Sequence, residues 1–138
     1  METNPLVLLV DDNDTDNLIN RRMLKLLAFT ERTVIANSGR KGLAYLREHK
    51  DNPEQLPDLV FLDINMPEID GFTFMENFSA LAPQLKKKVV VMVLSSSDDP
   101  QDINRITANP HVAYFITKPL DPAKMSVVQE VFSYQKSQ

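Results

Sequence analysis

The chain alternates between short apolar runs and longer amphipathic segments. Five runs rich in branched aliphatic residues have the length of β-strands, at residues 6–10, 33–36, 59–62, 89–94 and 112–116. Most of these runs are apolar at consecutive positions and not at every second position. This pattern is typical of strands that are covered on both faces, as in a parallel sheet.

The segments between the apolar runs have helical spacing. An apolar stripe at i, i+4, i+7 and i+8 predicts a helix over about residues 15–29; its members are Ile19, Met23, Leu26 and Leu27. Ser38 is the expected N-cap of a second helix that ends near residue 49. Three further helices are expected from residue 70 to before residue 83, over residues 99–108, and after residue 122.

Five β–α units in succession predict an α/β fold with a parallel sheet and helices on both faces. The common doubly wound arrangement of five strands is flavodoxin-like, a (βα)5 fold with strand order 2-1-3-4-5. We expect one domain over residues 1–138, with its core at about residues 6–133. In such a sheet the ligand lies outside the carboxyl ends of the strands.

Composition narrows the classes of partner. The net charge of −4 gives no overall positive field, so nucleic acid is not an expected ligand. The basic run at residues 86–88 is expected to be a solvated loop or a gatekeeping charge beside the apolar segment that follows. No secretory signal and no run of ~20 apolar residues is found, so we expect no membrane association and a cytoplasmic location. The absence of cysteine excludes disulfides, zinc–thiolate sites and thiol nucleophiles.

Polar residues occur at the expected strand ends. Asp11 and Asp12 follow the first strand, Asp63 follows the third, Ser95 follows the fourth and Lys118 follows the fifth. Taken singly, each would be read as a turn residue, a cap or a solvated charge. Chance is a poor explanation for four such sites at one edge of a sheet. The clustered carboxylates would repel one another, so they need a cation. Mg²⁺ favours carboxylate oxygens, so we expect a Mg²⁺ site that handles phosphate.

These residues belong to a longer pattern that resembles the response-regulator receiver domain of two-component signalling. The segments that carry the resemblance are residues 8–12 (Leu-Leu-Val-Asp-Asp), residues 63–71 (Asp-Ile-Asn-Met-Pro-Glu-Ile-Asp-Gly), residues 94–96 (Leu-Ser-Ser) and Lys118-Pro119. The resemblance covers about residues 6–133. It implies a stand-alone, CheY-like receiver, for which we expect no output domain.

The resemblance assigns roles to the acidic residues. Asp63 would accept a phosphoryl group from a sensor histidine kinase or a histidine phosphotransfer protein. Asp12 and Asp63 would hold Mg²⁺ together with the backbone carbonyl of Asn65, and Asp11 would act on the metal through water. The domain would assist its own phosphorylation and dephosphorylation without being a classical enzyme.

The resemblance also implies how the phosphoryl group is sensed. Ser95 and Lys118 would contact it, and Lys118-Pro119 would be a cis peptide. Ser95 and Phe115 would form the switch, which alters the surface of the fourth helix, fifth strand and fifth helix for an unknown downstream protein. Tyr114 stands where the family often has a small residue, so this part of the pattern departs from the usual one. We expect a monomer or a weak dimer.

Three other functions compete with a docking switch. A phosphorelay intermediate would pass the phosphoryl group to a second histidine protein, and the sequence does not separate the two. A Mg²⁺-dependent phosphatase with an aspartyl-phosphate intermediate would place a second Asp two positions after its nucleophile, where this chain has Asn65. A flavodoxin-like cofactor binder would need a phosphate-cradling loop at residues 11–14, which are Asp-Asp-Asn-Asp and repel phosphate.

Overall fold

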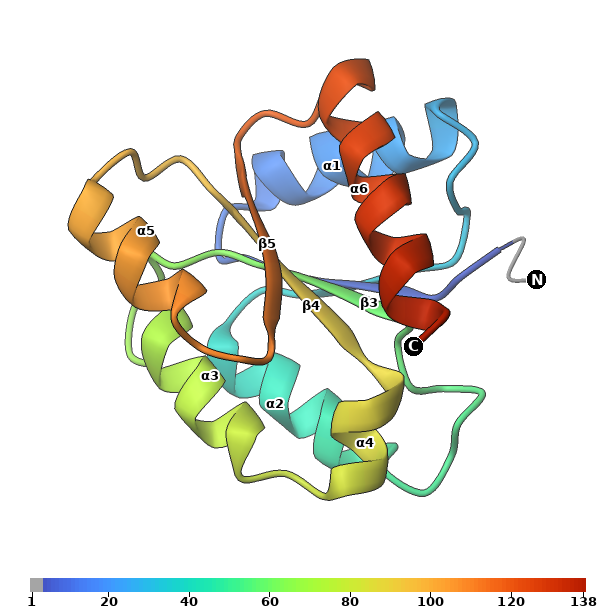
Figure 1. Ribbon diagram of the computed structural model, residues 1–138, viewed down its shortest axis with the longest axis vertical. Helices are drawn as coiled ribbons and strands as arrows, with labels where there is room; N and C mark the ends of the chain where they lie inside the picture. Colours follow the sequence, from blue (N-terminus) through green and yellow to red (C-terminus); the bar gives the residue numbers. More distant parts are fainter. Residues whose placement is uncertain (1–3) are drawn as a thin grey trace.

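The computed structural model describes residues 4–138 and has one five-stranded parallel sheet, shown in Figure 1. Its strands are β1 (Val7–Val10), β2 (Thr33–Ala36), β3 (Leu59–Leu62), β4 (Val90–Ser95) and β5 (Val112–Thr117). They pair in the order β2-β1-β3-β4-β5, so the predicted fold class and strand order are confirmed. β1 has β2 on one side and β3 on the other, and the winding reverses there, which is where this fold leaves room for a ligand.

Helices cover both faces of the sheet. In the described chain they are α1 (Asp14–Leu26), α2 (Gly39–Glu48), α3 (Gly71–Ser79), α4 (Pro83–Lys88), α5 (Pro100–Thr107) and α6 (Pro122–Lys136). Figure 1 shows α1 and α6 side by side on one face and α2 and α3 on the other. Within residues 4–138, no helix combines the length and apolarity needed to cross a membrane.

The consecutive apolar positions of the strands divide between two cores. Leu8 of β1 faces the core formed with α2, α3 and α5, whereas Leu9 faces the core formed with α1 and α6. The same alternation holds in β3, where Val60 and Phe61 belong to different cores. Side chains alternate across a strand, so a strand buried on both faces must be apolar at every position. This explains why these strands lack a period of two in the sequence.

The apolar stripe that predicts α1 is only in part the buried face of this helix, because Met23 and Leu27 pack half-buried against the core and the other two members do not. The buried residues of α1 are Asn17, Asn20 and Leu24, whereas Ile19 is 46% exposed and Leu26 is 67% exposed. Asn17 Nδ2 donates a hydrogen bond to the carbonyl oxygen of Asp11 at 2.8 Å. This bond ties the polar side of the first turns to the strand-end loop, and it helps to set which side of the helix faces inward.

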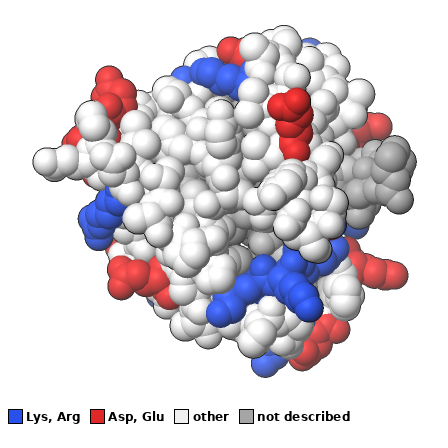
Figure 2. All heavy atoms as spheres, in the orientation of Figure 1, with Lys and Arg blue, Asp and Glu red and all other residues white. Residues whose placement is uncertain are grey.

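The basic run at residues 86–88 is not in a loop, which was one of the two expectations for it, because these lysines end the short helix α4. Pro83 begins that helix and Leu85 is fully buried under it. Lys86 Nζ donates to the carbonyl oxygen of Ser79 at 2.8 Å, and Lys88 Nζ donates to Asp58 at 2.7 Å. Figure 2 shows basic side chains gathered where Figure 1 places α4 and the end of α6. The extra helix makes the predicted fourth and fifth helices α5 and α6.

Candidate functional site

The predicted site residues converge at the carboxyl edge of the sheet. Asp11 and Asp63 follow the paired strands β1 and β3, and the amide of Asp63 donates to the carbonyl oxygen of Val10 at 3.0 Å. Ser95 ends β4, and its carbonyl oxygen accepts the amide of Lys118 at 2.9 Å, which brings the residue after β5 to the same edge. Parallel strands in register place their ends together, so residues far apart in sequence become neighbours.

Three carboxylates at this edge form a cluster suited to a cation. Each of Asp11, Asp12 and Asp63 offers a carboxylate oxygen, and these oxygens lie within 4.8 Å of one another. Asp11 and Asp63 are buried, while Asp12 is exposed. Like charges at this separation repel strongly unless a cation lies among them. The donor set, all carboxylate oxygen with an open side, fits a hard divalent ion such as Mg²⁺.

Asp63 has a buried carboxylate oxygen that is not used inside the protein. The residue is 6% exposed, and Oδ1 has no hydrogen-bond partner among the described residues. Burial raises the pKa of the Asp63 carboxyl and the charge of Asp11 adds to this rise, which outweighs the lowering by Lys118 and by the nearby Ser95 hydroxyl and Asn65 amide. An unpartnered buried carboxylate is costly, and buried polar atoms of this kind usually mark a place that a ligand or ion completes.

Lys118 is enclosed by three carboxylates. Its Nζ lies 2.6 Å from Asp11 Oδ2, 2.7 Å from Asp16 Oδ2 and 3.6 Å from Asp63 Oδ2. Burial favours the neutral amine, but the hydrogen bonds to Asp11 and Asp16 and the charge of Asp63 outweigh it and raise the pKa of Lys118. The lysine is therefore a permanent positive charge in the site. The peptide bond from Lys118 to Pro119 is cis, in agreement with the sequence prediction.

The loop after β1 holds the acidic residues by hydrogen bonds of its own. Asn13 caps α1 by accepting the amide of Asp16 at 2.9 Å. Asp11 Oδ1 accepts the amide of Asn13 at 2.9 Å, while Asp11 Oδ2 accepts from Lys118. Asp16 and Asn17 were not among the sequence-predicted site residues. An acid at the third position of a helix usually serves the helix terminus, and nothing in the sequence links it to a lysine 102 positions away.

The loop after β3 explains why residues 63–71 form so specific a motif. Glu68 has φ 64°, and the amide of Gly71 donates to the carbonyl oxygen of Ile64 at 2.8 Å. A Cβ atom at Gly71 would lie 2.7 Å from Ile64 Cα and 2.9 Å from the carbonyl oxygen of Asp63. Asp70 caps α3 by accepting the amide of Thr73 at 2.8 Å. Glycine at residue 71 thus allows the close turn that presents Asp63.

The predicted switch residues lie on β4 and β5. Ser95 is fully buried, its Oγ accepts the amide of Ser97 at 3.3 Å, and its hydroxyl is near enough to Asp63 to lower the pKa of that carboxyl. Phe115 is half-buried against the core beneath α2 and α3. Tyr114 points to the other side of β5 and is 38% exposed. The two side chains therefore leave the strand on opposite faces, and Tyr114 does not share the space of Phe115.

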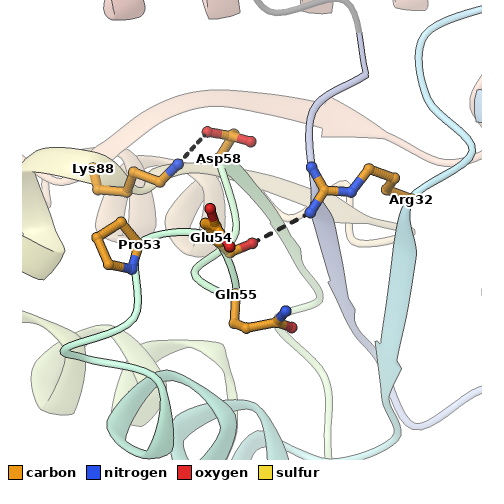
Figure 3. Close-up of a pocket in the computed structure, with 6 residues that line it drawn as sticks. All are labelled: Arg32, Pro53, Glu54, Gln55, Asp58 and Lys88. Carbon is orange, nitrogen blue, oxygen red and sulfur yellow. Dashed lines mark hydrogen bonds and ion pairs between the residues drawn. The ribbon is translucent and has the colours of Figure 1, made fainter.

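A polar pocket lies at the amino ends of the strands, opposite the acidic cluster, and the carboxylate in it has hydrogen-bond partners. Figure 3 shows it lined by Arg32, Pro53, Glu54, Gln55, Asp58 and Lys88. Asp58 Oδ2 accepts the amide of Leu6 at 3.0 Å, and Oδ1 accepts from Lys88 at 2.7 Å. Arg32 donates to the carbonyl oxygen of Glu54 at 3.3 Å. Both oxygens of Asp58 are used to join the amino end of the sheet to α4, which is a structural role.

Comparison with known proteins agrees with the geometry at the carboxyl edge. The model of the response regulator receiver domain matches residues 7–129. The probable methanogenesis regulatory protein FilR2 of Methanothrix harundinacea is 32% identical over 130 residues, which is 94% of this chain and 82% of that protein. The two-component response regulator ORR1 of rice is 35% identical over 120 residues, 83% of this chain, and the chain spans only 49% of its length.

Solved structures show the same fold along the whole chain. A two-component response regulator from Cytophaga hutchinsonii has a TM-score of 0.86 and 28% identity, covering 99% of this chain and 100% of that chain. The Mn²⁺-bound form of response regulator Rcp1 has a TM-score of 0.70 and 25% identity, and the match covers 96% of this chain and 90% of that chain. With the family model matching most of its length and the acidic cluster at the expected strand ends, this chain belongs to the response regulator receiver domain family.

Proposed function

We propose that this receiver domain accepts a phosphoryl group on Asp63 and uses it as a signal. The observation that carries the proposal is the buried, unpartnered Oδ1 of Asp63, which lies beside an acidic cluster and a charged lysine. No structural bond inside the described chain occupies this oxygen. It can therefore form a new covalent bond without breaking a hydrogen bond of normal geometry.

The reaction that fits this site is transfer from a phosphohistidine. A carboxylate oxygen of Asp63 attacks the phosphorus, an O–P bond forms, the N–P bond breaks, and the histidine nitrogen leaves with the electron pair. The donor would be a sensor histidine kinase or a histidine phosphotransfer protein. The sensor histidine kinase CheAY of Helicobacter pylori has a segment 41% identical to this chain over 69 residues, which supports that class of donor.

The residues at the edge of the sheet fit a Mg²⁺ ion that works with phosphate. Asp12 and Asp63 would bind it through their side chains, Asn65 through its backbone carbonyl, and Asp11 through water. The similar protein Rcp1 was solved with Mn²⁺, an ion that shares the preference for oxygen ligands. When bound, the ion supplies positive charge that offsets repulsion between the acidic residues and the incoming phosphoryl oxygens.

Ser95 and Lys118 would sense the modification. The new phosphoryl oxygens would accept hydrogen bonds from the hydroxyl of Ser95 and from the ammonium of Lys118. Movement of Ser95 would draw the loop after β4 toward Asp63, and Phe115 would turn with it. The surface of α5, β5 and α6 would then favour a different packing, because phosphorylation biases only states that it contacts differently. Figure 2 shows a largely uncharged surface over β5, which suits a protein partner.

The test is acid-labile phosphorylation by acetyl phosphate with Mg²⁺. Asp63→Asn should abolish labelling, because the amide cannot form the acyl phosphate. Asp58→Asn is the matched control, since Asp58 is equally buried beside a lysine at the other end of β3. It should label like the unaltered protein. Undiminished labelling of Asp63→Asn, or labelling that does not need Mg²⁺, would overturn the proposal.

A further inference from the structure

Asp16 is an unassigned acid in direct contact with the site lysine. Lys118 Nζ donates to Asp16 Oδ2 at 2.7 Å, whereas its distance of 3.6 Å from Asp63 Oδ2 is too long for a hydrogen bond. The Lys118 side chain is 11% exposed, so this ion pair is partly shielded from water. In the unmodified protein the lysine is therefore hydrogen-bonded to Asp11 and Asp16, and its ion pair with Asp63 is longer than a hydrogen bond.

The contact is not explained by capping of α1. Asp16 is the third residue of the helix, where an acidic side chain often accepts the amide of the N-cap residue. Here that amide, from Asn13, is already bonded to Asp11 Oδ1 at 2.9 Å. The Asp16 side chain is left to reach across to the end of β5. Its own backbone amide is fixed by Asn13 Oδ1 at 2.9 Å, which holds the residue in place.

We propose that Asp16 is a positioning residue that holds Lys118 away from Asp63 and competes with the phosphoryl group for the ammonium. This inference rests on the proposed phosphorylation of Asp63. An ammonium has three N–H donors, and in the unmodified protein two of them serve Asp11 and Asp16. A phosphoryl group on Asp63 replaces the single carboxylate charge by about −1.5 to −2 charges and brings strong acceptor oxygens. Lys118 then turns toward Asp63, and its bond to Asp16 is lost or lengthened.

The consequence is that Asp16 stabilises the unmodified state. Any group that binds one state and not the other shifts the equilibrium by its differential affinity. Removing the Asp16 charge takes away a partner that only the unmodified state uses fully. We therefore expect Asp16→Asn to bind an acyl-phosphate mimic about fivefold more tightly, a change typical of losing one partly exposed ion pair.

The experiment is a ¹⁹F NMR titration of beryllofluoride, BeF₃⁻, at saturating Mg²⁺. Asp14→Asn is the matched control, because Asp14 lies in the same helix turn, carries the same charge, is exposed and makes no ion pair within residues 4–138. Tighter binding in Asp16→Asn than in Asp14→Asn supports the proposal. Equal binding in the two variants overturns it, because general charge removal would then explain any gain.

The same comparison in a Lys118→Met variant tests whether Asp16 acts through Lys118. In Lys118→Met the Asp16→Asn substitution should change BeF₃⁻ affinity no more than Asp14→Asn does. An undiminished effect there overturns the positioning role. Failure of the proposed function looks different, because the unaltered protein would then bind no BeF₃⁻ at all. The ion pair itself is checked without any ligand by the ¹⁵N signal of Lys118 Nζ, which should shift in Asp16→Asn and not in Asp14→Asn; an unmoved signal also counts against the proposal.

Discussion

One short strand, β3, has a buried aspartate before it and another after it, each beside a lysine. Asp58 precedes β3 and lies 2.7 Å from Lys88, and Asp63 follows it and lies 3.6 Å from Lys118. Their side chains are almost equally buried, at 6% and 7% exposure. Yet the pKa of Asp58 is lowered and the pKa of Asp63 is raised. Two aspartates at similar depth thus differ in the direction of their pKa shifts.

The difference lies in the partners of each carboxylate. Burial alone would raise the pKa of Asp58, but hydrogen bonds from Lys88 and the Leu6 amide and the charge of Lys136 reverse the shift. Asp63 keeps one oxygen without a partner and has Asp11 beside it. A complete set of donors makes a buried carboxylate part of the scaffold. An incomplete set, next to like charge, makes it a place for a ligand or a covalent modification.

The largest effect on stability is expected for substitution of Asp58, at the amino end of β3. Asp58→Asn should lower the free energy of unfolding by about 2–3 kcal/mol, because it removes a charged hydrogen bond and leaves Lys88 without its counter-charge. Urea unfolding measures this loss. Asp51→Asn, at an exposed residue of a loop, is the control for removal of one acid. Equal stability of the two variants would show that the Asp58 cluster adds nothing to the fold.

The pH dependence of stability should reflect the lowered pKa of Asp58. The pKa of Asp58 is lower in the folded chain, so its contribution is fully present above the ordinary Asp pKa of about 3.9 and is lost as pH falls through the folded value. The stability gap between the unaltered protein and Asp58→Asn should therefore shrink below pH ~4, by at most about 1.4 kcal/mol per pH unit. Unfolding free energies measured between neutral and acid pH give this gap. A gap that widens in acid would contradict the assigned direction.

The smallest effect, and the opposite sign, is expected at the other end of β3. The raised pKa of Asp63 means that its ionised form is unfavourable in the folded protein. Without metal at neutral pH, Asp63→Asn should raise the free energy of unfolding by about 0.5–1 kcal/mol. Thermal unfolding in a chelator measures the gain. Added Mg²⁺ should stabilise the unaltered protein and not the variant, and a loss of stability in the chelator would contradict the comparison.

Several parts of the candidate site could be predicted from sequence because they depend on local order. Asp11, Asp63, Ser95 and Lys118 each stand at the end of an apolar run, and parallel strands bring such ends together. The motif at residues 63–71 is similarly local, since the atoms nearest to a Cβ at Gly71 belong to Asp63 and Ile64. The proposed roles of these residues in metal binding and phosphorylation remain predictions for the experiments above.

Other parts could not be predicted because their partners are distant. Nothing near Asp16 indicates that it binds Lys118, and nothing near residues 86–88 indicates that Lys88 binds Asp58. The apolar stripe of α1 was a correct signal for a helix and a poor one for its buried face. The hydrogen bond from Asn17 to Asp11 forms only in the folded protein, and the helical periodicity of the sequence does not predict it.

The sequence by itself determined the order of the strands and of every described helix except α4, the five-stranded parallel sheet and the edge at which the polar residues meet. These features follow from the spacing of apolar residues and from the handedness of strand connections, which are properties of the chain alone. Only the tertiary structure decided which aspartate has all its partners and which one lacks them. That distinction depends on the donors Leu6, Lys88 and Lys118 and on the acceptor Asp16, which approach through space, and it separates the scaffold carboxylate from the proposed phosphoacceptor.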